Sequence, residues 1–374
     1  MNPYIIPSLA LLMALAHGTP KVVEIRTPDG GIQPVAEAHA SGNVHIVYFK
    51  GDPANGDLFH AVRLAGANEF SQGTRVNSQD GSAVAMGTIR GAQLALGREG
   101  HVHVVWNGSN KAAPDENHHR APMLYARSND SGKTFEPERN LITKAYGLDG
   151  GGAIAADDNG QVEVFWHAGS PDSGETGRQI WVTRSGNDGK TFAPEVTAWD
   201  KPTGVCGCCG MTAGASGNRS CVLYRSATER VDRDIYLLQS DGKQATFSGT
   251  VLDHWKTESC PMSAMALSFA GDATAAAWEG KGGDVAYAII GTKIANRVPH
   301  REKKRKFPDI ALAPDGHVLL AWVDGGGWKK EGALGWQLFA PDGKAIGTPK
   351  SGSVSAAWSK PGAVFDGNIF IIIH

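Results

Sequence analysis

The chain has 374 residues, of which 41% are hydrophobic and 20% are charged, and its net charge is −2. This near-neutral balance gives no reason to expect nucleic acid or an anionic membrane as a partner. The 48 glycines and the low aromatic content of 8% favour many short strands joined by tight turns. An all-β chain of this length can form one domain.

The first segment in chain order is an apolar run from Ile5 to Ala16 that ends in Ala14-Leu15-Ala16, a triplet with a small residue at its first and third positions. This pattern is typical of a secretory signal peptide, and the run is too short to span a bilayer. We therefore expect residues 1–16 to be a signal peptide and residues 17–374 to be one exported, periplasmic or extracellular domain. The lack of Lys or Arg before the run, and Pro7 within it, keep a buried strand or a misassigned start as alternatives.

A repeated pattern then runs through the chain: a strand of small apolar residues, a turn with Gly, Asp or Asn, and a β-rich strand ending in an aromatic residue. Examples are AQLALGREGHVHVVW, AIAADDNGQVEVFW and IALAPDGHVLLAW. The marking aromatics recur every 44 to 60 residues, at Tyr48, Trp106, Trp166, Tyr224, Trp278 and Trp322. A second pair of strands follows each copy, as in MLYARS, and four short strands per repeat are typical of a β-propeller blade.

The number of blades depends on how the chain ends pair. Six full repeats are visible, and AVFDGNIFIII at the C-terminus supplies the inner strands of a seventh or closing blade. We expect the segment from Lys21 to Pro28 to pair with it, which would remove two sheet edges. The prediction is an all-β propeller of six or seven four-stranded blades, with a β-sandwich as the alternative.

Two similar octapeptides, SNDSGKTF and SGNDGKTF, lie inside these repeats. In such turns an Asp or Asn side chain accepts backbone N–H bonds, and Gly adopts a positive φ. The matching positions are Ser128, Asp130, Gly132, Thr134 and Phe135 in the first copy, and Ser185, Asn187, Gly189, Thr191 and Phe192 in the second. A degenerate third copy spans Ser240 to Phe247.

The octapeptides resemble the Asp box, or BNR repeat, of the sialidase superfamily of propellers. That resemblance implies that the boxes are structural turns between the third and fourth strands, on the face opposite the active site. It directs attention to the other face, where CGCC, RDIYLL and CPMS also look like a group of exported bacterial sialidase-like proteins.

Four of the five cysteines lie in two links that enter consecutive blades: Cys206, Cys208 and Cys209 in CGCC, and Cys260 in SCPM. Adjacent links are close in space, so we expect a disulfide from Cys260 to one of the other three, and no cofactor. A thiolate metal site formed by these residues, with His254 as a further ligand, is the alternative. Cys221 lies within a strand and is expected to be a buried apolar residue.

Charged residues cluster in the same region. A substrate carboxylate could be bound by an Arg cluster, for which the candidates are Arg120, Arg225, Arg230 and Arg233. The candidate acids or bases are Asp232, Asp234 and Glu279. An Arg–Asp lattice that fixes neighbouring loops is the alternative, and His118, His119, His167 and the basic run from His300 to Lys306 are expected to be solvated.

The resemblance implies a sialidase mechanism with three arginines, a Tyr–Glu pair and an Asp. This chain has no Tyr after Tyr287 and no Arg after Arg305, so the late members of that set are missing. We expect a monomeric propeller that recognises a glycan through its Arg- and Cys-rich face, with glycoside hydrolysis unassigned. The alternative is a non-catalytic scaffold that binds a protein or a glycan.

Overall fold

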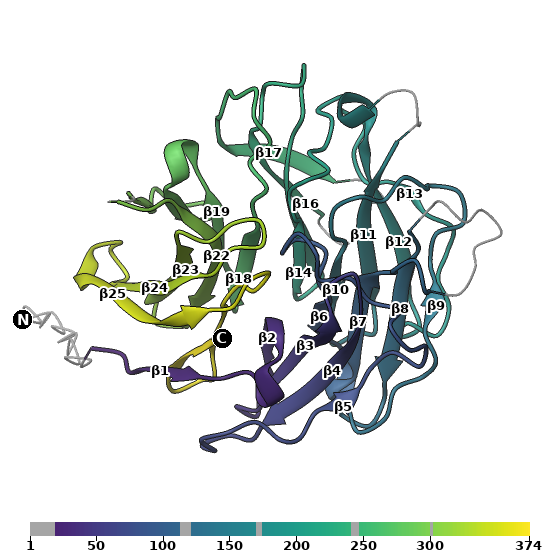
Figure 1. Cartoon of the computed structure of the whole chain (residues 1–374), viewed down its shortest axis with the longest axis horizontal. Helices are drawn as coiled ribbons and strands as arrows, with labels where there is room; N and C mark the ends of the chain where they lie inside the picture. The colour runs from purple at the N-terminus through teal and green to yellow at the C-terminus, as the bar shows by residue number, and fades with distance from the viewer. Residues whose placement is uncertain (1–18, 113–120, 170–173, 241–246, 300–301) are drawn as a thin grey trace, which may run out of the picture.

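The computed structural model describes residues 19–112, 121–169, 174–240, 247–299 and 302–374. Seven β-sheets follow one another in chain order, six with four strands and one with three. Their inner strands gather around a common centre (Figure 1). The predicted propeller is confirmed, and the number of blades is seven.

The first three blades occupy the N-terminal half. Blade 1 contains β2 (Ile32–Ala38), β3 (Val44–Asp52), β4 (Asn55–Arg63) and β5 (Thr74–Arg75). Blade 2 contains β6 (Gln93–Leu96), β7 (Val102–Asn107), β8 (Met123–Ser128) and β9 (Arg139–Asn140). Blade 3 contains β10 (Ala153–Ala156), β11 (Val162–Ala168), β12 (Gln179–Ser185) and β13 (Val196–Thr197).

The remaining blades complete the ring. Blade 4 contains β14 (Thr212–Ser216), β15 (Arg219–Arg225), β16 (Ile235–Gln239) and β17 (Ser248–Asp253). Blade 5 contains β18 (Met265–Ala270), β19 (Ala273–Glu279), β20 (Val285–Ile289) and β21 (Ala295–Val298). Blade 6 contains β22 (Arg305–Leu312), β23 (Val318–Asp324), β24 (Gly332–Phe339) and β25 (Ala345–Ser355). Blade 7 contains β26 (Gly362–Phe365), β27 (Phe370–Ile373) and the N-terminal β1 (Val22–Ile25).

Short 3₁₀ turns are the only helical elements among the described residues: η1 (Pro28–Gly30), η2 (Arg98–Gly100), η3 (Gly174–Gly177) and η4 (Lys281–Gly283). Within the same part of the chain, none of these helices has the length and apolarity needed to cross a membrane.

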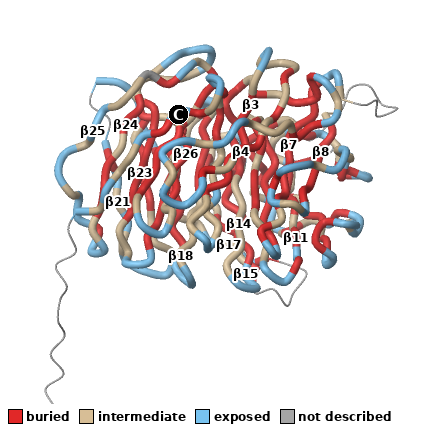
Figure 2. The backbone as a smooth tube through the Cα atoms, turned by 90° about the horizontal axis from the view of Figure 1, so that it is seen from below, coloured by how far each residue is buried: buried red, intermediate tan, exposed pale blue. Residues whose placement is uncertain are grey.

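Apolar side chains of each blade are buried against the next blade. Phe49 of blade 1, for example, belongs to the same buried cluster as Leu94 and Trp106 of blade 2. Trp106, Trp166 and Trp322 are at most 1% exposed, and burying a side chain of this size contributes about 5 kcal/mol. Figure 2 shows the buried residues along the strands and the exposed residues mainly in the connecting loops. The recurring aromatics are therefore the packing units between blades.

The two chain ends close the ring. β1 pairs in parallel with β27, with Val22 opposite Phe370 and Ile25 opposite Ile373. The Thr27 N–H donates to the His374 carbonyl at 2.8 Å. The predicted pairing of the chain ends is thus present in the structure.

The two octapeptides form the turns between the third and fourth strands of blades 2 and 3. Ser128 Oγ accepts from the Gly132 N–H at 2.8 Å, and Asp130 Oδ1 accepts from the Thr134 N–H at 2.9 Å. In the second copy Asn187 Oδ1 accepts from the Thr191 N–H at 2.9 Å. We call the end of the propeller that carries these turns the octapeptide face. Most of the degenerate third copy, residues 241–246, lies outside the described residues.

The aromatic residue of each octapeptide packs on its neighbouring blade. Phe135 packs edge-on against His60 with ring centroids 5.6 Å apart, and Phe192 does the same with Tyr125 at 5.0 Å. Gly189, in the second copy, has φ +70°, and a Cβ at this position would overlap the Tyr125 hydroxyl. The octapeptides therefore fix a turn and join it to the blade beside it.

Replacing Gly189 with Ala should destabilise the protein more than replacing Gly217, whose φ is +59° and whose surroundings are open within 4 Å. Both changes carry the left-handed backbone cost of about 1 kcal/mol. Only Gly189→Ala adds an overlap, which we expect to lower the free energy of unfolding by a further amount of about 1–3 kcal/mol. Urea unfolding of both variants measures the difference, and equal losses would contradict the packing role of this turn.

Candidate functional site

The opposite end, which we call the loop face, is formed by the links into the inner strands and the loops between second and third strands. The link before β14 carries Cys206, Cys208 and Cys209, and the link before β18 carries Cys260. These links enter neighbouring blades, so their cysteines meet. The structure joins Cys208 to Cys260, whose Cα atoms are 6.7 Å apart.

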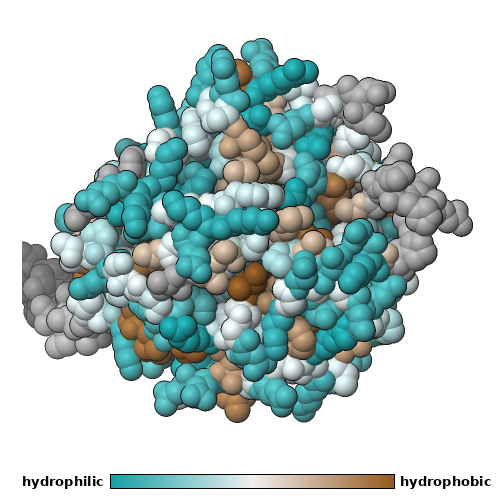
Figure 3. Space-filling view, in the orientation of Figure 1, coloured by the Kyte–Doolittle hydropathy of each residue, from teal (hydrophilic) through white to brown (hydrophobic). Residues whose placement is uncertain are grey.

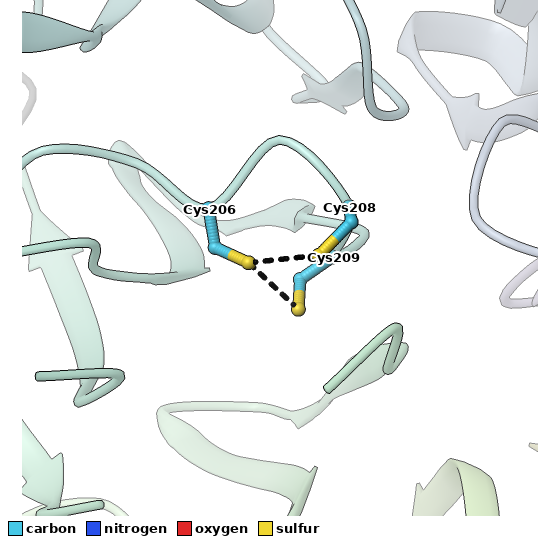
Figure 4. Close-up of side chains that lie close together, drawn as sticks. All are labelled: Cys206, Cys208 and Cys209. Carbon is cyan, nitrogen blue, oxygen red and sulfur yellow. Dashed lines mark hydrogen bonds between the residues drawn. The ribbon is translucent and has the colours of Figure 1, made fainter. Parts of the chain in front are cut away.

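The three sulfurs of the CGCC segment point toward one another (Figure 4). Cys206 Sγ lies 3.3 Å from Cys208 Sγ and 3.2 Å from Cys209 Sγ. Cys206 and Cys209 are buried, at 1% and 2% exposed, whereas Cys260 lies at the surface. Because Cys260 is bonded to Cys208, four sulfurs form one group. We call this group, formed by Cys206, Cys208, Cys209 and Cys260, the sulfur cluster. Cys221 lies apart from it, buried in β15 as expected.

The two buried thiols differ in acidity. The hydrogen bond that Cys206 donates to Cys209, together with burial, raises the pKa of Cys206. Burial also opposes ionisation of Cys209, but the Cys206 donor and the Arg225 guanidinium lower the pKa of Cys209 to about 6. Ser263 Oγ lies 3.7 Å from Cys209 Sγ as a further donor. Cys209 is therefore the cysteine of this pair that carries negative charge more readily.

Two candidate substrate-binding arginines lie beside the sulfur cluster, and both are buried. Arg225 is 1% exposed, donates to the carbonyls of Arg233 and Glu279 at 2.7 and 2.6 Å, and stacks over Trp255. Arg233 is 5% exposed and donates to Glu175 Oε2 at 2.8 Å. Their guanidinium groups thus hold neighbouring loops, as in the lattice alternative. Arg230 lies in an exposed turn, and Arg120 falls outside the described residues.

Ion pairs continue from Arg233 across blades 4, 3 and 2. Glu175 lies 3.8 Å from Arg178, Arg178 lies 3.6 Å from Asp149, and Asp149 lies 2.7 Å from Arg90. Glu175 Oε1 also accepts from the Gly207 N–H at 2.9 Å, which ties the chain of charges to the CGCC segment. The sequence does not predict this set of residues, because ion pairs between distant loops leave no spacing signal.

The three candidate acids have separate partners. Glu279, at the end of β19, is 2% exposed and accepts from Lys306 Nζ at 2.9 Å. Its burial raises its pKa to about 7, against the opposing effect of Lys306 and Arg225. Asp234 accepts from the Trp255 N–H at 3.0 Å and lies 3.1 Å from His254. Asp232 bonds through its backbone, where its N–H donates to the Thr228 carbonyl.

The expectation of solvation is wrong for His167 and for the last two residues of the basic run, whereas residues 302–304 of that run are exposed as expected. Lys306 and Arg305 of the basic run belong to β22, and Lys306 is bonded to Glu279 because the inner strand β22 packs next to β18 and β19 of blade 5. His167 is fully buried in β11, where its Nε2 accepts from the Gly150 N–H at 2.9 Å. His118 and His119 fall outside the described residues.

An aromatic pair lies on the same face at the mouth of the central channel. Trp328, in the loop after β23, is 51% exposed and packs edge-on against Trp358 at 4.7 Å. The Trp358 carbonyl accepts from Gln33, which lines the channel cavity of about 300 Å³. Trp328 also borders Gly87, next to Arg90. In the view of Figure 3 the surface is mostly hydrophilic, with small apolar patches near the centre.

Comparison with known proteins gives a fold but no family. No family model and no curated protein sequence matches the chain. Among solved structures, an ulvan lyase is 15% identical over 89% of this chain and 87% of its own, with a TM-score of 0.54. An intramolecular trans-sialidase from Ruminococcus gnavus is 11% identical over 84% and 95%, with a TM-score of 0.52. A lectin of Aleuria aurantia in complex with a methyl fucoside is 13% identical over 88% and 96%, with a TM-score of 0.50.

Burial of His167 makes stability depend on pH. Burial, reinforced by Arg178, lowers the pKa of His167 from 6.5 to about 3. Below pH 6.5 the unfolded chain therefore binds a proton that the folded chain does not, so stability falls as pH falls toward 3. The free energy of unfolding of the wild type, relative to His167→Gln, should fall by about 1.4 kcal/mol per pH unit in this range.

Urea unfolding at several pH values between 7 and 4 measures this slope. His254→Gln is the control, because the His254 side chain is 81% exposed. The free energies of unfolding of the wild type and His167→Gln could instead change in parallel with pH. That result would contradict the prediction, because His167 would then bind its proton equally in the folded and unfolded states.

Proposed function

We propose that the protein is an exported glycan-binding propeller that recognises carbohydrate through its loop face. The observation that carries the proposal is Trp328, a half-exposed indole at the channel mouth, close to the Arg90–Asp149 ion pair. A sugar ring offers an apolar C–H face and a rim of hydroxyls, which suit an aromatic surface and adjacent charged groups. The three structures compared above, two enzymes acting on glycans and one lectin, support the same class of ligand.

Glycoside hydrolysis is a second candidate, favoured by Glu279. A carboxyl group with a pKa near 7 has the acidity expected of a general acid, and Asp232 or Asp234 would be its partner. Binding is favoured over hydrolysis because Glu279 is buried and bonded to Lys306.

Export and a monomeric state belong to the proposal as well. A protein that binds extracellular glycans must leave the cytoplasm, and residues 1–16 have the pattern of a cleavable signal peptide. The mass of the secreted chain tests the cleavage, and its sedimentation tests the monomer.

Trp328→Ala should weaken glycan binding at least about tenfold, since it removes the apolar platform. A glycan array identifies a ligand for the wild type, and calorimetry with that ligand compares the variants. Leu64→Ala is the matched control: Leu64 is 63% exposed and follows β4 at the octapeptide face. Equal losses in the two variants, or a wild type that binds no glycan, would contradict the proposal.

We expect the mature protein not to hydrolyse a fluorogenic sialoside. Arg225 and Arg233 are buried and donate to internal acceptors. Their guanidinium groups are therefore not free to form the two parallel hydrogen bonds that bind a substrate carboxylate. Turnover by the wild type that disappears in a folded Arg233→Ala variant would overturn this expectation. The same assay with other aryl glycosides tests glycoside hydrolysis, the second candidate function. If Glu279 is the general acid, Glu279→Gln should lose the turnover that the wild type shows.

A further inference from the structure

The sulfur cluster is independent of the glycan proposal and carries an inference of its own. Three of its cysteines fall within four consecutive residues, and the fourth comes from the link of the next blade. Cys206, Cys208 and Cys209 place their sulfurs within 4.8 Å of one another. A disulfide requires only two cysteines, so the pair Cys208–Cys260 leaves the convergence of Cys206 and Cys209 on the same point unexplained.

The CGCC segment is held by its backbone as a rigid donor set. The Cys206 N–H donates to the Arg225 carbonyl at 2.9 Å, the Gly207 N–H to Glu175 Oε1 at 2.9 Å, and the Gly210 N–H to the Ser263 carbonyl at 2.9 Å. A Cβ on Gly207 would lie 2.8 Å from Asp149 Oδ2, so this position is closed as well. The loop therefore fixes three sulfurs before any ligand arrives, which is what a metal site requires.

The surroundings suit a group of negative sulfurs. Arg225 and Arg233 lie next to the cluster, and Ser263 Oγ is directed at Cys209 Sγ. Buried charge needs compensation by opposite charge and hydrogen bonds, and thiolates provide a soft ligand set that selects Cu(I) or Zn(II). The nearest carboxylates are already engaged, since Glu175 binds Arg233 and Glu279 binds Lys306.

We propose that the reduced sulfur cluster is a binding site for one soft, thiophilic metal cation, with Cys206, Cys208, Cys209 and Cys260 as ligands. A cation about 2.3 Å from each sulfur separates tetrahedrally placed sulfurs by about 3.8 Å. The observed separations of 3.2 and 3.3 Å from Cys206 reach that value by a shift of about half an ångström. Arg225 and Ser263 are positioning residues that stabilise the thiolates.

Oxidation and metal binding exclude each other at this site, because the Cys208–Cys260 bond uses two of the four ligands. A dithiol reductant opens the bond by exchange: its two thiols become a disulfide, and two electrons and two protons pass to Cys208 and Cys260. The cation then replaces thiol protons, which are released to solvent. The sulfur cluster is therefore a site that binds the metal cation only when Cys208 and Cys260 are reduced.

The test uses the full chain, reduced with dithiothreitol, freed of the reductant without oxygen, and titrated with Cu(I) or Zn(II) against chromophoric chelators. We expect one cation per chain for the reduced protein and loss of binding after oxidation with oxidised glutathione. Binding of Cu(I) alone, Zn(II) alone or both identifies the cation and supports the site. A reduced wild type that takes up neither cation overturns it.

Variants separate the sulfur cluster from adventitious thiols. Cys209→Ser should weaken binding at least about 100-fold, beyond the usual cost of altering an outer-sphere residue. Cys221→Ser is the matched control, since Cys221 is buried in β15 outside the cluster. Cys260→Ser removes the surface ligand without altering a buried position, so it keeps the test valid if Cys209→Ser does not fold. Affinities equal to wild type in Cys209→Ser or Cys260→Ser would overturn the assignment of the ligands.

Discussion

Burial of apolar side chains between blades is the interaction on which the rest of this structure depends. One blade has two apolar faces and cannot cover either by itself. The ring solves this because each blade covers its neighbour, and the last contact joins blade 7, which contains β1 and β27, to blade 1, with Ile25, Ile371 and Ile46 in one buried cluster. This packing fixes the strand ends from which the described loops of the loop face extend.

The sequence determined the fold in outline because the signals were local and repeated. Trp106, Trp166 and Trp322 mark strands that must be covered on both sides, and the Gly-containing turns before them fix the strand order. The sequence leaves six or seven blades open because blade 7 is built from β26, β27 and β1, which come from opposite ends of the chain. Two strands at one end and one at the other do not form a repeat in the sequence.

The site was predictable only in part. The meeting of Cys260 with the CGCC segment followed from the rule that neighbouring links share a face. The use made of Arg225 and Arg233 did not follow, since a guanidinium that binds a substrate and one that binds a backbone carbonyl look identical in a sequence. The basic run predicts a solvated Lys306, whereas the packing of β22 next to blade 5 brings Lys306 to Glu279.

Closure by β1 and β27 also sets an order on the assembly of the ring. Six interfaces join blades that are consecutive in the chain, so each can form as soon as its two blades exist. The seventh joins blade 7 to blade 1, and β1 pairs with β27 inside blade 7, so neither contact can form until residues 370–373 have been made. Until that moment β1 has no strand to pair with, and the ring stays open at one place with an apolar face on each side.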